Sequence, residues 1–73
     1  MKKTYKLEDL DCAVCAAKMA EAVRKIEGVE NAEVSFLTQR MTVEADEALL
    51  PEIMKKAAKV CRRIEPNCKI ITD

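Results

Sequence analysis

Two cysteines two residues apart are the side chains of this sequence best suited to chemistry. Cys12 and Cys15 lie in the stretch DLDCAVCAAKM, where a polar segment gives way to the pattern of a helix. At the start of a helix, exposed backbone N–H groups and the positive end of the helix dipole favour the thiolate over the thiol. Thiolate is the form that binds metal, and two sulfurs at this spacing can reach one ion. The pair is therefore a candidate metal site, redox couple or pair of small core side chains.

We favour the metal site over the other two roles. A free thiol at the mouth of a loop is a liability unless it has a function, which argues against core filling. The chain is shorter than an ordinary thioredoxin domain, and it has no tryptophan and no pattern of parallel strands, which argues against a thiol-disulfide oxidoreductase. Histidine is absent, so a metal site here must use sulfur and oxygen ligands.

Composition indicates one small globular domain that spans residues 1–73. Hydrophobic residues make up 49% of the chain and charged residues 36%, which is typical of a folded domain. The 13 basic and 13 acidic residues cancel and aromatic residues are rare, so nucleic acid is not an expected partner. No apolar run approaches the ~20 residues that span a bilayer, and the N-terminal MKKTYKLEDL is too polar for a signal peptide. We therefore expect a cytoplasmic domain that does not insert into a membrane and whose thiols stay reduced.

Hydrophobic periodicity predicts two helices and four strands around the cysteine pair. Alternation indicates strands, whereas apolar residues at three- and four-residue steps indicate amphipathic helices, as from Cys15 to Ile26. Gly28 is placed to end the first helix in a left-handed conformation, and Pro51 is expected in the first turn of the second. The expected elements are strands at about 3–7, 29–36, 40–45 and 68–71, and helices that begin near residue 14 and after residue 46.

This order of elements predicts an α+β fold, the ferredoxin-like βαββαβ sandwich. With right-handed crossovers, the four strands form one antiparallel sheet and both helices cover the same face. The loop after the first strand and the loop after the second helix then emerge at the same end of the sheet. Cys12 and Cys15 are therefore expected near the end of the second helix, which carries Cys61.

The other sulfur-bearing side chains fit the core better than a metal site. Cys61 follows the apolar stripe of the second helix, so we favour a core position, with a third sulfur ligand as the alternative. Cys68 is expected in the last strand, and a reducing compartment disfavours a disulfide between these two residues. Met19 and Met54 lie on helical stripes and are expected in the core rather than as copper ligands.

A long segment of the chain resembles a known family. The stretch LEDLDCAVCAAKMAEAVRKIEGVENAEVSFLTQRMTVEAD is similar to the heavy-metal-associated domain, whose loop carries CxxC before a helix that ends at a Gly-Val strand entry. More narrowly, LDCAVCAAK and the later RRIEP resemble N-terminal domains of bacterial zinc, cadmium and lead P-type ATPases. The resemblance implies a βαββαβ domain that holds a soft metal ion through Cys12 and Cys15, with Asp11 at the acidic position of the zinc and cadmium branch.

The chemistry of Asp11 agrees with that branch. A carboxylate supplies a hard oxygen and a negative charge, which favour a divalent ion over two-coordinate Cu(I). The competing role for Asp11 is to cap the first helix, and we favour the ligand. The chain departs from the commonest family pattern, because Asp9-Leu10 replaces Gly-Met and the Gly-aromatic pair after the second helix is missing. Both changes weaken a copper assignment, and Leu10 is still expected to be an apolar plug beneath the loop.

These features together predict a noncatalytic domain that accepts and passes on Zn(II), Cd(II) or Pb(II). The resemblance implies attachment to a transporting ATPase, with the membrane portion of that ATPase or a metal-donor protein as partner. We expect a monomer when no metal is bound. The alternatives are a stand-alone Cu(I) metallochaperone and, third, a small thiol-disulfide oxidoreductase.

Overall fold

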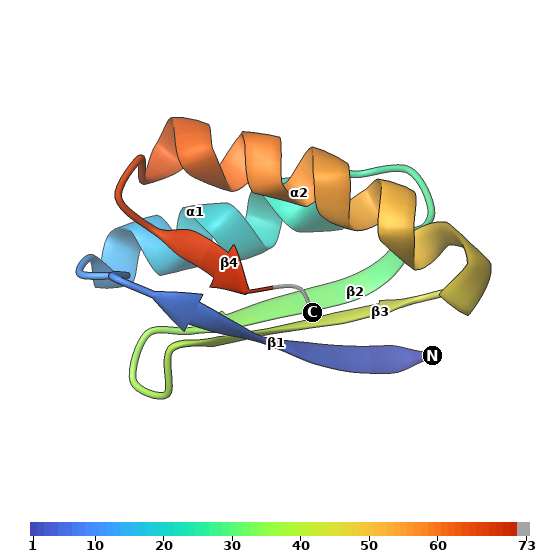
Figure 1. Ribbon diagram of the computed structural model, residues 1–73, viewed down its shortest axis with the longest axis horizontal. Helices are drawn as coiled ribbons and strands as arrows, with labels where there is room; N and C mark the ends of the chain where they lie inside the picture. Colours follow the sequence, from blue (N-terminus) through green and yellow to red (C-terminus); the bar gives the residue numbers. More distant parts are fainter. Residues whose placement is uncertain (72–73) are drawn as a thin grey trace.

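The computed structural model describes residues 1–71 and has the predicted order of strands and helices. The elements are β1 (Lys2–Glu8), α1 (Ala13–Arg24), β2 (Val29–Ser35), β3 (Arg40–Ala45), the 3₁₀ turn η1 (Glu47–Leu49), α2 (Leu50–Ile64) and β4 (Lys69–Ile71). The strands form one sheet in the order β2-β3-β1-β4, in which every neighbouring pair is antiparallel. Both helices lie on the same face of this sheet (Figure 1). The ferredoxin-like sandwich predicted from the periodicity is therefore confirmed.

The hydrophobic core lies between the helices and the covered face of the sheet. Strand β3 shows the alternation most clearly, with Met41, Val43 and Ala45 fully buried and polar residues between them. Helix α1 buries Met19, and helix α2 buries Met54, so both methionines are core side chains as predicted. Full burial of one such apolar side chain stabilises the fold by about 1.5–3 kcal/mol.

Helix α1 ends earlier than the position of Gly28 suggests. Its last residue is Arg24, and the backbone N–H of Lys25 donates to the carbonyl of Ala22 at 3.2 Å, which tightens the final turn. The tight turn lets Ile26 pack against the core before the chain enters β2. Gly28 does adopt a left-handed conformation, with φ of +96°, but it lies in the connection to β2 and not at the helix cap.

Two residues, Asp46 and Pro51, determine where helix α2 starts. The carboxylate of Asp46 accepts a hydrogen bond from the backbone N–H of Ala48 at 3.1 Å and so caps the 3₁₀ turn η1. Pro51 occupies the first turn of α2, as predicted, where its missing N–H costs no helical hydrogen bond. The helix then runs for 15 residues toward the loop that leads into β4.

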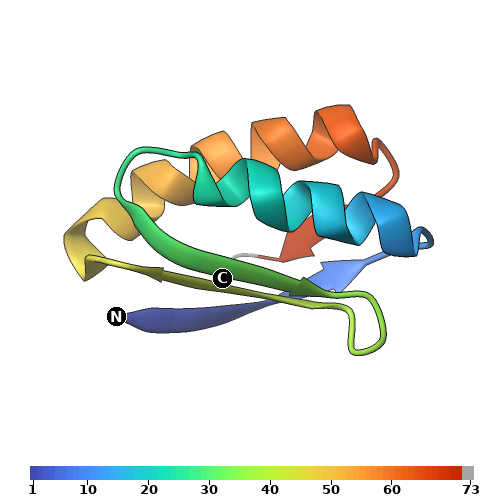
Figure 2. The same cartoon turned by 180° about the vertical axis from the view of Figure 1, so that it is seen from behind.

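Three connections meet at one end of the sandwich. They are the β1–α1 loop with the first cysteine, the β2–β3 turn and the loop from α2 to β4, and the N-terminus lies at the opposite end (Figures 1 and 2). The predicted proximity of the cysteine loop to the end of α2 is therefore confirmed.

Among residues 1–71, no helix is long and apolar enough to cross a membrane.

Candidate metal site

Helix α1 begins at Ala13, so Cys12 itself is the N-cap residue. Its backbone is extended, with φ of −131° and ψ of 114°, and its Sγ accepts a hydrogen bond from the backbone N–H of Cys15 at 3.1 Å. The alternative in which Asp11 caps the helix is therefore wrong. Asp11 lies one residue before the cap, where its side chain is exposed.

Cys12 and Cys15 interact in a way that sets the pKa values of their thiols apart. A hydrogen bond from the Cys15 thiol is the main cause that lowers the pKa of Cys12, and the backbone N–H groups of Cys15 and Val14 lower it further. The same bond is the main cause that raises the pKa of Cys15 to about 11, and burial and the charge of Cys12 act in the same direction. The thiolate that the helix start was predicted to favour is thus supported at Cys12, whose pKa is lowered, and not at Cys15, whose pKa is raised.

Glu65 is a charged neighbour of the cysteine pair that sequence reasoning missed. It is the C-cap residue of α2, and its negative charge raises the pKa of both Cys12 and Cys15. The Glu65 carboxylate accepts a hydrogen bond from the backbone N–H of Asn67 at 3.3 Å within the same loop. The segment RRIEP contains this residue and was the available signal, but nothing in its pattern indicates that the charge acts on the cysteines.

The other two cysteines are buried thiols. Cys61 is 1% exposed and Cys68 is 8% exposed, and neither forms a disulfide. Burial is the main cause that raises the pKa of Cys61 to about 11, so this thiol stays neutral. Its core position is therefore confirmed. Within residues 1–71, no three cysteine or carboxylate side chains converge closely enough to hold a metal ion, so the structure does not gather Asp11 or Cys61 with the cysteine pair.

Two residues before the cysteines anchor the loop. Leu10 is 1% exposed and belongs to the core, as expected of an apolar plug. Asp9 has a φ of +61°, a left-handed conformation that glycine adopts without strain and that aspartate tolerates better than most residues. The structure thus explains why the commonest family pattern has glycine where this chain has Asp9.

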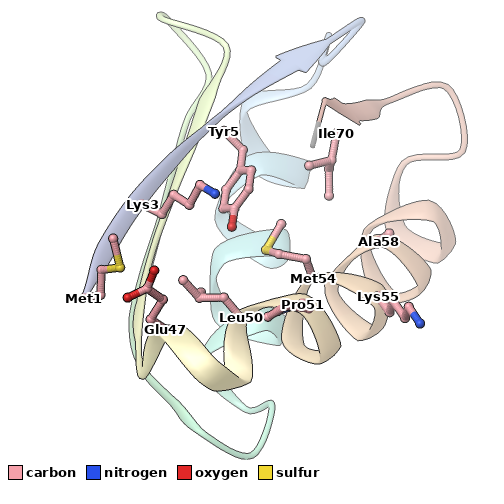
Figure 3. A pocket seen from close by; sticks show the side chains of 10 residues that line it. All are labelled: Met1, Lys3, Tyr5, Glu47, Leu50, Pro51, Met54, Lys55, Ala58 and Ile70. Atoms are coloured by element: carbon pink, nitrogen blue, oxygen red, sulfur yellow. The ribbon is translucent and has the colours of Figure 1, made fainter. Parts of the chain in front are cut away.

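A surface cavity of about 610 Å³ lies away from the cysteines, between α2 and the first half of β1 (Figure 3). Tyr5 and Met54 point toward it from the strand and the helix, and Lys3 lies at its side. Strand β4 contributes Ile70 to the lining, and within residues 1–71 it pairs with β1 only at Lys6–Glu8. None of the lining residues belongs to the cysteine loop, so the cavity does not extend the candidate metal site.

A ferredoxin-like sandwich with two thiols at the start of its first helix has the architecture of a small metal-binding domain. The model of the heavy-metal-associated domain matches residues 4–61, and the chain belongs to this family. It is therefore a heavy-metal-binding domain. Family membership confirms the resemblance drawn from the residues around Cys12 and Cys15.

Relatives of this domain handle more than one kind of metal ion. The cadmium, zinc and cobalt-transporting ATPase of Bacillus subtilis is 31% identical over 70 residues, which is 96% of this chain and 10% of that protein. The copper chaperone CopZ of Enterococcus hirae is 30% identical over 64 residues, which is 88% of this chain and 86% of the chaperone. A solved CopZ metallochaperone superposes with a TM-score of 0.74 over 97% of this chain and 100% of that one, at 15% identity, which shows the shared fold.

The chain spans about a tenth or less of the length of the first ATPases that it matches, 8% and 10% in two of them. It spans most of the length of the copper chaperone. The relatives of this chain thus include both heavy-metal transporters and a copper chaperone.

Proposed function

We propose that this domain accepts and passes on Zn(II), Cd(II) or Pb(II), with Cys12 and Cys15 as thiolate ligands and Asp11 as an oxygen ligand. The observation that carries the proposal is the position of the Cys12 sulfur. It caps α1, accepts the backbone N–H of Cys15 at 3.1 Å and has a lowered pKa. Thiolate sulfur suits these ions, and Asp11, which is exposed and directly precedes Cys12 in the chain, can turn toward a bound ion and supply the charge and the oxygen that a divalent ion prefers.

Binding through both sulfurs requires the loss of a proton from Cys15. Cys12 has the lower pKa and ionises first, and the Cys15 thiol must lose its proton when an ion binds both sulfurs. An incoming divalent charge supplies the driving force, because it stabilises both thiolates at once. Both cysteines are partly exposed, so a partner's ligands can approach the ion and replace these sulfurs one at a time.

We further propose that residues 1–73 form one cytoplasmic domain of a longer metal-transporting ATPase. The support is that the chain is 34% identical over 56 residues to the zinc/cadmium/lead-transporting P-type ATPase of Shigella sonnei. In this role the domain is not catalytic. It is a monomer in the absence of metal and exchanges the ion with a donor protein or with the membrane portion of the ATPase.

Calorimetric titration of single cysteine variants with Zn(II) tests the ligand assignment. Cys12→Ser and Cys15→Ser should each weaken binding sharply, while circular dichroism shows an intact fold, since the core does not depend on either side chain. Cys68→Ser is the matched control, because it also removes one thiol but leaves the loop unchanged. Undiminished affinity in both loop variants would overturn the site.

A Cu(I) chaperone is the second candidate function, and the match to nearly the whole length of CopZ favours it. Asp11→Asn separates the two candidates, since replacing the charged carboxylate by a neutral amide, a weaker ligand, should lower Zn(II) affinity by roughly tenfold, or about 1.4 kcal/mol, and lower Cu(I) affinity much less. Asp9→Asn is the matched control, because it neutralises a carboxylate in the same loop and asparagine tolerates the left-handed backbone there. An unchanged ratio of Zn(II) to Cu(I) affinity in Asp11→Asn would favour the copper chaperone.

A further inference from the structure

The side chain of Gln39 joins the β2–β3 turn to the loop that leads to the cysteines. Its Oε1 accepts the backbone N–H of Leu10 at 3.0 Å, and its Nε2 donates to the carbonyl of Leu10 at 2.7 Å. The same Nε2 donates to the carbonyl of Phe36 at 2.8 Å. One amide group therefore satisfies both backbone groups of Leu10 and ties them to the neighbouring turn, although 29 positions separate the two residues in the sequence.

This contact lies at the point where β1 separates from β3. The backbone carbonyl of Gln39 accepts the N–H of Leu7 at 2.7 Å, next to the last β1–β3 pair at Lys6 and Arg40. Beyond that pair, the left-handed backbone of Asp9 turns the chain away from β3. At Leu10 the side-chain amide of Gln39 takes the role that a backbone peptide group of a paired strand would have, because a primary amide also carries both a donor and an acceptor.

The backbone of Gln39 is held in an uncommon conformation that suits this contact. Its φ is +55°, a left-handed value that costs a residue with a Cβ roughly 1 kcal/mol. Glycine or asparagine would adopt this conformation more easily in a turn, but neither reaches Leu10 with an amide of this length. The described contacts account for glutamine at this position.

We infer that Gln39 is a positioning residue for the metal site, which it serves by fixing Leu10 and so the backbone that presents Cys12. Leu10 is fully packed in the core and stands two residues before the first sulfur. With both backbone groups of Leu10 held, the loop is already ordered before an ion arrives, so less ordering accompanies binding. An ordered loop also retains its ion for longer, since release through local opening becomes rarer. The inference rests on the proposed metal site.

Gln39→Met tests this role, because methionine has a similar length and lacks both hydrogen-bonding groups. Two measurements on the whole chain apply. By hydrogen exchange, the amide of Leu10 should exchange about tenfold faster, while the amides of Met41 and Val43 in β3 keep their rates. By stopped flow with a chelator, Zn(II) should dissociate severalfold faster at a temperature far below the unfolding midpoint.

Thr38→Ala is the matched control in the same turn. Thr38 is exposed and donates its backbone N–H to Ser35 Oγ at 3.2 Å, a bond that the substitution leaves in place. The control should match the wild type in both measurements. A second variant, Gln39→Gly, removes the side chain and also relieves the left-handed strain, so it remains folded even if the methionine variant does not.

The outcomes separate the inference from the proposed function. Fast exchange at Leu10 with unchanged β3 amides supports the positioning role, and faster Zn(II) release extends it to the ion. Unchanged exchange at Leu10 in both variants, or an equal increase at Leu10 and in β3, would overturn it. Failure of the wild type to bind Zn(II), Cd(II) and Pb(II) would refute the proposed function instead, and the exchange rates would still decide whether Gln39 orders the loop.

Discussion

Replacing Cys12 by serine should make Cys15 more reactive, although no group is added near it. The Cys15 pKa is raised to about 11 mainly by its hydrogen bond to the Cys12 sulfur and also by the charge of that sulfur. Serine removes this charge and the strong acceptor. It also keeps an oxygen that can cap α1 in place of the sulfur that now accepts the Cys15 N–H, so the helix does not lose its first turn. The pKa of Cys15 should therefore fall toward its ordinary value of 9.0.

The size of the effect follows from the rise of the Cys15 pKa from 9.0 to about 11. A lower pKa raises the fraction of Cys15 that is thiolate at about pH 8. The nucleophilicity of the thiolate falls at the same time, with a Brønsted coefficient of about 0.4–0.5. Roughly half of the gain in labelling rate therefore remains on a logarithmic scale. Removal of the full shift then accelerates alkylation about tenfold, and removal of half of it about threefold. Burial and Glu65 still act on Cys15 in the variant, so we expect a value between these limits.

The assay is the rate of iodoacetamide labelling at Cys15, followed by mass spectrometry of its peptide. Cys15→Ala provides the reciprocal comparison, because Cys12 loses the thiol donor that lowers its pKa and should be labelled more slowly than in the wild type. Val14→Ala is a control, since this exposed side chain lies between the cysteines and its loss leaves both sulfurs in place. Labelling of Cys15 that is unchanged or slower in Cys12→Ser would show that Cys12 does not raise the pKa of Cys15.

Three further substitutions have defined outcomes. Cys61→Ala should cost about 1 kcal/mol near pH 7, because a small core group is lost. Between about pH 9 and 11 the wild type should lose stability, because the unfolded chain releases the Cys61 proton while the folded chain, with its raised pKa, keeps it. The variant lacks this thiol, so its stability should fall less over the same range. Urea unfolding at both ends of the range measures the difference. Gly28→Ala should lower the free energy of unfolding by about 1–2 kcal/mol, because φ is +96° and the new Cβ would lie 3.2 Å from Leu49 Cδ1. Glu27→Ala is the control, because it changes the neighbouring exposed residue and should alter the free energy of unfolding little. Glu65→Gln should lower the pKa of both loop thiols and speed their labelling, and slower labelling would show that its charge does not act on them.

Periodicity was sufficient to predict the fold because each element buries one continuous apolar face. The alternation in β3 and the stripe of α2 each correspond to a buried set in the structure, and Cys61 could be assigned to the core on that basis alone. The end of α1 was less predictable. Gly28 marks a left-handed residue, but the tight turn that precedes it depends on how Ile26 meets the core, which is a tertiary contact.

The details of the candidate site depend on contacts that leave no local signal. Asp11 and Cys12 are adjacent and both can cap a helix, so only the first helical residue decides between them, and helix boundaries are poorly determined by sequence. The contacts of Gln39 with Leu10 and the effect of Glu65 on the cysteines join segments far apart in the chain. No spacing rule predicts them, because they arise where three connections meet at one end of the fold.

The most direct test of the metal site counts the sulfurs that bind one ion. Sulfur-to-Cd(II) charge-transfer absorbance, measured per bound ion, should have the intensity of two thiolates in the wild type. Cys12→Ser and Cys15→Ser should each lose about half of this intensity, and Cys61→Ala should lose none, because its thiol is buried and lies outside the loop. Full intensity in both loop variants, or a loss in Cys61→Ala, would contradict a site built from Cys12 and Cys15.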